Sequence, residues 1–163
     1  VVIDLLTQMK NFMSPKNGMS VPAAMEVGMN ELNALAKEEN VHIFGIAQFN
    51  RASDDGKPYS IKDIDKLRPS ISSVKNSGAL AERARVLLSI FRPKYYADKY
   101  LQDDEEAKNM EDIMEITVLK NSSGKTGLRL KYKYESEFYR CLPIKPEEEA
   151  AKKERDILAN INY

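Results

Sequence analysis

Residues 32–51 read as a helix that leads into a buried strand ending on polar residues, and this segment limits the fold of the chain more than any other. The strand part, from Val41 to Phe49, is mostly apolar and does not alternate. Apolar runs of this kind are typical of parallel strands that helices cover on both faces. Ligands of such sheets bind beyond the carboxyl ends of the strands, and Gln48 and Arg51 lie at that end.

The first four residues repeat this design. Val1, Val2 and Ile3 are β-branched, and a carboxylate, Asp4, follows them. An Asp at the end of a buried strand has the form of a Walker B strand, whose carboxylate holds the Mg²⁺ of a bound nucleotide. Two such strands predict an α/β fold with a mainly parallel sheet flanked by helices.

Four later segments follow in order: Ala47-Gln48-Phe49-Asn50-Arg51, Arg68 to Leu80 with Arg-Pro at its start and Ser-Gly near its end, Arg92-Pro93-Lys94-Tyr95-Tyr96, and Glu115 to Gly127 with Lys120 inside it. With the first strand, they resemble successive motifs of the RecA-like motor domain of DnaB-type hexameric replicative helicases. Those motifs are the Walker B strand, Ser-Gln-Leu-x-Arg, Arg-Pro…Asp-Leu-Arg-Glu-Ser-Gly, Arg…Tyr-Tyr and Lys-x-Arg-x-Gly-x-x-Gly. The resemblance covers residues 1–139, and its order is more specific than any single segment.

The resemblance implies the C-terminal part of a RecA-like P-loop NTPase core, with a β-hairpin near its end. It implies an ATP-dependent DNA helicase that uses ATP and Mg²⁺ and moves along single-stranded DNA as a homo-oligomeric ring. A primase or a helicase loader would be a further partner. The expected compartment is the cytoplasm of a bacterial or virus-infected cell.

The same resemblance assigns roles to residues around the nucleotide. Asp4 would be the metal ligand and a catalytic residue, against the alternative of a strand cap. Gln48 would sense the γ-phosphate, since its amide can donate to a phosphate oxygen and accept from a partner; the alternative is a hydrogen bond to neighbouring backbone. Arg51 would also contact the nucleotide, unless it is an ordinary surface residue. Lys120 would contact the nucleotide of the neighbouring subunit.

The predicted DNA-binding loop consists of Lys75, Asn76, Ser77 and Gly78. In the family this loop holds one DNA strand, and a lysine with backbone amides suits phosphate contacts that carry no sequence information. An ordinary turn is the alternative interpretation of this loop.

A P-loop is missing from the sequence. The tripeptide at 124–126, Gly-Lys-Thr, only imitates one, because Leu119 stands where the first glycine of the motif belongs and the segment joins two predicted strands. We therefore expect a P-loop-bearing N-terminal half, on the same or a separate polypeptide, to complete the motor. Residues 1–163 alone are predicted to have no ATPase activity.

Several positions depart from the family. Ser122 stands where the family has the arginine of Lys-x-Arg, a finger that in related NTPases is worth orders of magnitude in rate. Lys125 lies three residues further on and lacks the planar guanidinium group. Ser73, Lys75 and Asn76 also differ from the usual loop residues. Residues 81–85, Ala-Glu-Arg-Ala-Arg, reverse the charge of an acidic family segment.

These departures leave two interpretations open. One is a divergent helicase, such as a viral one. The other is a non-catalytic RecA-like module that assembles a replication complex through its hairpin and C-terminal helix. A recombinase or clock-type RecA relative fits the Arg-Pro…Ser-Gly loop less well.

The predicted organisation is a core at residues 1–142 and a charged helical tail at 143–163. Ser20 should cap a helix that packs Met25, Met29, Leu32 and Leu35 on one face. Further predictions are helical turns at 61–67 and 78–83, a buried strand at 84–91, a loop or short helix at 103–106, a hairpin of 114–120 with 128–134, and a helix at 147–160.

Composition excludes several classes of site. The 25 basic and 25 acidic residues leave no global field for nucleic acid, so any DNA contact must be local. One Cys and one His exclude an internal disulfide and make a zinc site implausible. Both are expected to be structural, with His42 packed or at a sheet edge and Cys141 without a chemical role. No apolar run approaches the ~20 residues that span a bilayer, so no membrane partner is expected.

Overall fold

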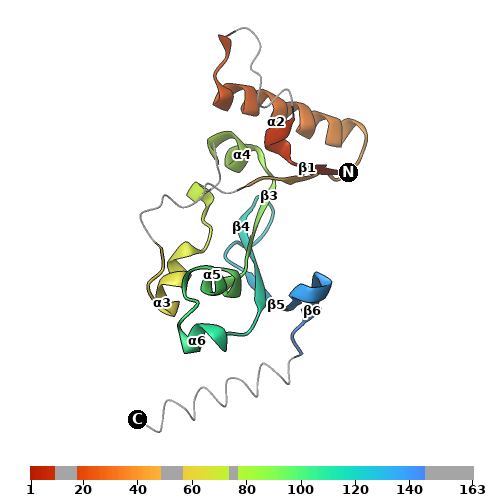
Figure 1. Cartoon of the computed structure of the whole chain (residues 1–163). Helices are drawn as coiled ribbons and strands as arrows, with labels where there is room; N and C mark the ends of the chain where they lie inside the picture. The colour runs from red at the N-terminus through yellow and green to blue at the C-terminus, as the bar shows by residue number, and fades with distance from the viewer. Residues whose placement is uncertain (10–17, 49–56, 74–76, 146–163) are drawn as a thin grey trace. The chain divides into compact units, whose positions relative to one another are not determined.

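The structure is a computed structural model that describes residues 1–9, 18–48, 57–73 and 77–145 (Figure 1). The chain divides into two compact units, each made of segments distant in sequence. The first consists of Val1–Lys57, Lys66–Ser89 and Thr117–Leu128, and the second of Pro58–Asp65, Ile90–Ile116 and Arg129–Tyr163. The helix predicted at 147–160 lies outside the described residues, and the boundary at residue 142 stays a prediction.

A parallel pair of strands and a long helix form the frame of the first unit (Figure 1). Strand β1 (Val2–Asp4) pairs in parallel with β2 (Phe44–Ile46), and Asp4 stands opposite Ile46. Helix α2 (Val21–Glu38) connects them. It begins where the sequence predicts, because the Ser20 hydroxyl accepts a hydrogen bond from the Ala23 N–H at 3.4 Å.

The core of the first unit lies on one side of this pair. It combines Leu6 with Met25 and Met29 of α2 and Leu80 of α4 (Ser77–Arg83). The prediction for the apolar face of α2 is confirmed at both methionines, and Leu32 packs partly against the same cluster. It is wrong for Leu35, which is 46% exposed.

The other face of the strand pair is bare in the described part of the chain, so the predicted burial of β2 on both faces is wrong there. Gly45 faces the core, since a Cβ there would overlap the Leu6 side chain. Its neighbours Phe44 and Ile46 point the opposite way and are 65% and 45% exposed. Among the described residues, no helix covers this face, and an apolar strand sequence alone cannot reveal a missing cover.

The remaining described strands form a sheet in the order β3-β4-β5-β6. Their bounds are Val86–Phe91 for β3, Ile113–Asn121 for β4, Arg129–Glu135 for β5 and Arg140–Pro143 for β6. The predicted hairpin is confirmed as β4 and β5, and the Val118 N–H donates to the Leu128 carbonyl at 2.9 Å. Strand β6 pairs antiparallel with β5 and was not predicted. The predicted strand at 84–91 is confirmed as β3, but Val86 and Leu88 are half exposed.

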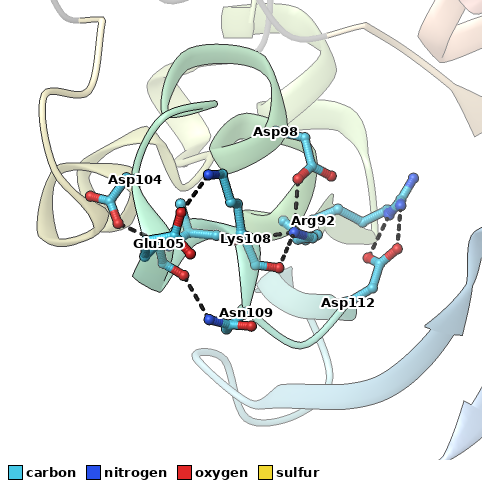
Figure 2. Close-up of polar contacts among 9 residues, drawn as sticks. Arg92, Asp98, Asp104, Glu105, Lys108, Asn109 and Asp112 are labelled. Carbon is cyan, nitrogen blue, oxygen red and sulfur yellow. Dashed lines mark hydrogen bonds and ion pairs between the residues drawn. The ribbon is translucent and has the colours of Figure 1, made fainter.

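Short helices surround a small core in the second unit. Helix α5 (Pro93–Tyr100) follows β3, α6 (Glu105–Lys108) follows α5, and α3 (Ile61–Ile64) packs against α5. Ile64 and Ala97 are fully buried here. The acidic segment predicted as a loop or short helix is α6, and its cap Asp104 accepts from the Ala107 N–H at 3.0 Å (Figure 2).

An ion pair ties the start of α5 to the strand that follows α6. The Arg92 guanidinium donates to both carboxylate oxygens of Asp112, at 3.3 Å and 2.7 Å (Figure 2). It also lies 3.9 Å from the ring centroid of Tyr134. Arg92 and the tyrosines after it belong to a segment singled out by the family resemblance, and here this arginine holds the local structure together.

Candidate functional site

Two of the predicted site residues lie at the same edge of the parallel strand pair. Asp4 is the last residue of β1, and Gln48 follows the end of β2 by two residues. Because Asp4 is in register with Ile46, both side chains lie at the carboxyl ends of adjacent parallel strands. Both are exposed, as expected of groups at the edge where ligands of such sheets bind.

The chemistry of this edge suits a nucleotide with its metal. The Asp4 carboxylate is a hard oxygen ligand, and Mg²⁺ commonly takes only one or two protein carboxylates and fills its other positions with water and phosphate oxygens. The described residues contain no cluster of three or more metal-ligating side chains. Arg51, the third predicted residue of this group, lies outside the described residues.

The predicted DNA loop is described only in part. Lys75 and Asn76 lie outside the described residues, and Ser77 is the first residue of α4. Gly78 follows it and is exposed, and a Cβ there would meet nothing within 4 Å. The C-terminal half of the predicted loop is thus the first turn of a helix.

Lys120 has a contact that the sequence did not predict. Its ammonium group donates to the carbonyl oxygens of Ala81 and Glu82, both at 2.7 Å. These carbonyls belong to the last turn of α4, where helix carbonyls lack partners within the helix. Lys120 therefore caps α4 in this structure.

Ser122 lies beside Arg85. The Ser122 N–H donates to the Arg85 carbonyl at 2.9 Å, and both residues line an open hollow of about 590 Å³. The hollow is lined by Asn30, Asn33, Ala34, Lys37, Glu38, Glu82, Arg83, Ala84, Arg85 and Ser122. We call it the basic hollow. The sequence showed two separate departures from the family, the reversed charge of 81–85 and Ser122. It did not predict that they lie close together.

A second hollow of about 520 Å³ is mainly apolar and lies between the strand regions of β2 and β3. Its lining includes Phe44 and Gly45 from β2 and Val86, Leu87 and Leu88 from β3. Among the described strands, β2 pairs only with β1 and β3 only with β4. Each therefore presents an open edge, and we call the space between them the strand slot.

His42 was predicted to be packed or at a sheet edge within a strand, but it precedes β2 and is exposed, and the structural role predicted for Cys141 stays a prediction. The His42 carbonyl accepts from the N-terminal amino group at 2.8 Å, and the residue is exposed at the start of the β2 region. Cys141 is exposed on β6, with its Sγ 3.4 Å from the Met114 Sδ. No helix in the described part of the chain is both long and apolar enough to cross a membrane.

Comparisons with known proteins agree on one relationship. The family model for the DnaB-like helicase C terminal domain matches residues 1–141. Replicative DNA helicase DnaB of Mycoplasma pneumoniae is 31% identical over 146 residues, which are 84% of this chain and 26% of that protein. Replicative DNA helicase DnaB of Rickettsia felis is 26% identical over 145 residues, 83% of this chain and 27% of that protein.

A solved structure shares the fold. It is described as a DnaB-like replicative helicase and its interactions with primase, and it matches 89% of this chain and 30% of its own length. The TM-score is 0.65 at 21% identity, so this likeness shows a shared fold, the RecA-like fold of the α/β class. The chain spans about a quarter of the length of the curated relatives it matches.

Proposed function

The chain belongs to the family of DnaB-like helicase C-terminal domains, and from this membership we propose that it is the C-terminal half of the motor of an ATP-dependent replicative DNA helicase. The complete motor would translocate along single-stranded DNA and unwind duplex in the cytoplasm of a bacterial or virus-infected cell. The chain alone would be inactive. The proposed domain division is a core at 1–142 with a tail at 143–163.

The shared edge of Asp4 and Gln48 is the observation that carries this proposal. The register of β1 and β2 brings a carboxylate and an amide to the carboxyl ends of adjacent parallel strands. The carboxylate would hold the Mg²⁺ of ATP, directly or through a water, and the ion would neutralise charge on the phosphates. The Gln48 amide would bind the γ-phosphate and change its hydrogen bonds when the phosphate leaves. Arg51 would add a positive charge to the same site.

The strand slot is an argument that this chain needs the P-loop-bearing half to complete its fold. An open strand edge presents unpaired N–H and C=O groups, which a further strand can satisfy. Open edges on both β2 and β3, with an apolar hollow between them, suit one inserted strand that joins the two sheets. We propose that the P-loop-bearing half supplies this strand, from the same or a separate polypeptide.

The DNA and the other partners follow from the same family membership. We propose that Lys75, Asn76, Ser77 and Gly78 contact the phosphates of single-stranded DNA inside a ring of identical subunits. The interaction with primase that is described for the solved relative makes a primase, or a loader, a candidate partner of this chain as well.

An assembly module without catalysis is the second candidate, and two observations favour it. Ser122 replaces the arginine that the family places in the hairpin. Lys120, the other basic residue of that motif, is engaged by the carbonyls of α4. A chain that lacks both groups at the subunit interface could still fold into the ring and bind partners.

Two steps test the proposal. The tagged chain is recovered together with its P-loop-bearing half, and ATP hydrolysis by the complex is then measured with single-stranded DNA. We expect no hydrolysis by the chain alone and DNA-stimulated hydrolysis by the complex. Asp4→Asn should lower the rate of the complex about 100-fold or more, because loss of metal-based charge stabilisation is worth several kcal/mol.

Asp103→Asn is the matched control, since Asp103 is an exposed carboxylate at the start of the α6 region. It should leave the rate unchanged. Hydrolysis by the isolated chain would contradict the proposal. A complex that assembles on DNA but does not hydrolyse ATP would favour the assembly module instead.

A further inference from the structure

The basic hollow is built from segments that are far apart in sequence but belong to one compact unit. The C-terminal part of α2 contributes Lys37, the residues before β3 contribute Arg83 and Arg85, and the turn after β4 contributes Ser122. Two hydrogen bonds to main-chain carbonyls hold these segments together. Asn33 Nδ2 donates to the Arg83 carbonyl at 3.2 Å, and the Ser122 N–H donates to the Arg85 carbonyl at 2.9 Å.

Some of the charged side chains that line the hollow form ion pairs, and others do not. Arg83 forms an ion pair with Glu26 of α2. Within the described part of the chain, neither the Lys37 ammonium nor the Arg85 guanidinium has a hydrogen-bond or ion-pair partner. Glu38 and Glu82 also line the hollow, so its lining has three basic and two acidic side chains. The two basic groups without partners are therefore the ones available to an anion.

The types of group suit a phosphate. A guanidinium offers a planar set of donors that matches phosphate oxygens, a lysine adds a point charge, and a serine hydroxyl can donate a further hydrogen bond. The hollow is open and wide enough for a phosphate group with part of what it is attached to.

We propose that Lys37, Arg85 and Ser122 form a binding site for a phosphate group, with Arg85 as its main ligand. Position 122 lacks the arginine of the family motif, and the main chain of an arginine, Arg85, is hydrogen-bonded to the Ser122 amide. Two sources share the required chemistry, the triphosphate of a nucleotide and the phosphodiester of single-stranded DNA.

The location indicates whose phosphate is bound. Lys37 lies in the last turn of α2, which leads toward the start of β2, whereas Asp4 and Gln48 lie at the carboxyl ends of the same strand pair. The Lys37 side of the basic hollow is therefore connected to the amino end of β2, whereas Asp4 and Gln48 lie at the carboxyl ends. Subunits that contact each other head to tail would bring the hollow of one to a phosphate bound by the next. This last step rests on the proposed function, but the phosphate site itself does not.

Binding to the full 163-residue chain tests the site. ATP binding would be measured by calorimetry and binding of a labelled oligo-dT by fluorescence anisotropy, both at one low salt concentration because phosphate contacts weaken with salt. Arg85→Gln should weaken binding about tenfold or more, as expected for loss of a charge-assisted hydrogen bond. Glu38→Gln should tighten binding, because it removes a negative charge from the lining.

Lys62→Gln is the control, since it removes one positive charge from an exposed position of α3 outside the hollow. It should change binding by less than about twofold, the size expected of an exposed charge that makes no contact. Circular dichroism checks that each variant is folded. Loss of ATP binding in Arg85→Gln identifies a nucleotide as the source, and loss of oligo-dT binding identifies DNA.

The proposal is overturned if the folded chain binds neither probe, or if Arg85→Gln binds as tightly as the wild type. An equal loss in Lys62→Gln also overturns it, because net charge would then explain the effect. None of these results depends on ATP hydrolysis. The phosphate-site proposal can therefore be refuted while the proposed motor function holds, and the motor function can be refuted while the phosphate site holds.

Discussion

Lys120 shows how one side chain can have a structural contact and a predicted functional one. The family resemblance gives it a role at the nucleotide of a neighbouring subunit. In the structure its ammonium group satisfies two carbonyls of the last turn of α4, both at 2.7 Å. A positive charge at a helix C-terminus also interacts favourably with the helix dipole.

We predict that Lys120→Met destabilises the chain. The two carbonyls of α4 would lose their charged donor, which should lower the free energy of unfolding by about 1–3 kcal/mol. Urea denaturation monitored by circular dichroism measures this change. Lys125→Met is the control, because Lys125 is exposed in the turn between β4 and β5. Equal stability of the two variants would mean that the Lys120 contacts contribute nothing to folding.

Single residues also mark the limit of prediction from sequence. Asp4 and Gln48 could be paired in advance, because parallel strands bring their carboxyl ends to one edge. The contact between Ser122 and Arg85 could not, since it depends on how a turn after β4 meets a segment more than thirty residues earlier. Local pattern contains no signal for such a contact.

At the scale of elements, the prediction was best where capping and turn residues act locally. Ser20 marked the start of α2, and the hairpin was predicted from its two strand segments. Helix α5 was missed, although Pro93 stands in its first turn, a position that proline favours. The motif resemblance drew attention to the Arg…Tyr-Tyr pattern there instead of to the helix that contains it.

Tyr96 on α5 should make the stability of the fold depend on pH. Burial raises the pKa of the Tyr96 phenol above its ordinary value, and the nearby Tyr95 and Tyr100 add to the increase. Its ring stacks on Phe91 with 5.2 Å between centroids. The folded state thus holds the phenolic proton more tightly than the unfolded state does, so stability must fall once the unfolded chain begins to ionise.

We predict that the free energy of unfolding decreases as the pH rises above about 10, the ordinary pKa of tyrosine. Tyr96→Phe should reduce this slope, because its ring cannot ionise. Urea denaturation at a series of alkaline pH values measures the slope. Tyr59→Phe serves as control, since Tyr59 is 90% exposed. An unchanged slope in Tyr96→Phe would show that other groups cause the alkaline loss of stability.

At the scale of the whole molecule, β2 and β3 are less covered by the described residues than their apolar sequences suggested. The exposed apolar side chains include Phe44 and Ile46 on β2 and Val86 and Leu88 on β3. Exposed apolar side chains that gather on one surface usually mark an interaction site. The α/β class could be predicted from the sequence, but an apolar strand sequence does not show which of its faces is covered.

We predict that the isolated chain binds the hydrophobic dye ANS and self-associates as its concentration rises. Addition of the P-loop-bearing half should reduce both effects, because the bare face and the strand slot would then be covered. Dye fluorescence and light scattering measure them. Phe44→Thr should lower dye binding by the chain alone, whereas Tyr139→Thr, at an exposed position of the second unit, should lower it less. Dye binding that persists in the complex would contradict this explanation.

The strand slot also has a consequence for how quickly the motor core can form. If the P-loop-bearing half is on the same polypeptide, the strand between β2 and β3 comes from a segment distant in sequence, and such pairing is slow because the chain must first close a long loop. If it is on a separate polypeptide, the pairing must wait until the two chains meet. Helix α2 and the hairpin depend mainly on neighbours in sequence and can form earlier. The backbone amides at the two open edges would then be the last in the core to gain protection from hydrogen exchange, which makes the meeting of the two halves the slow step of folding.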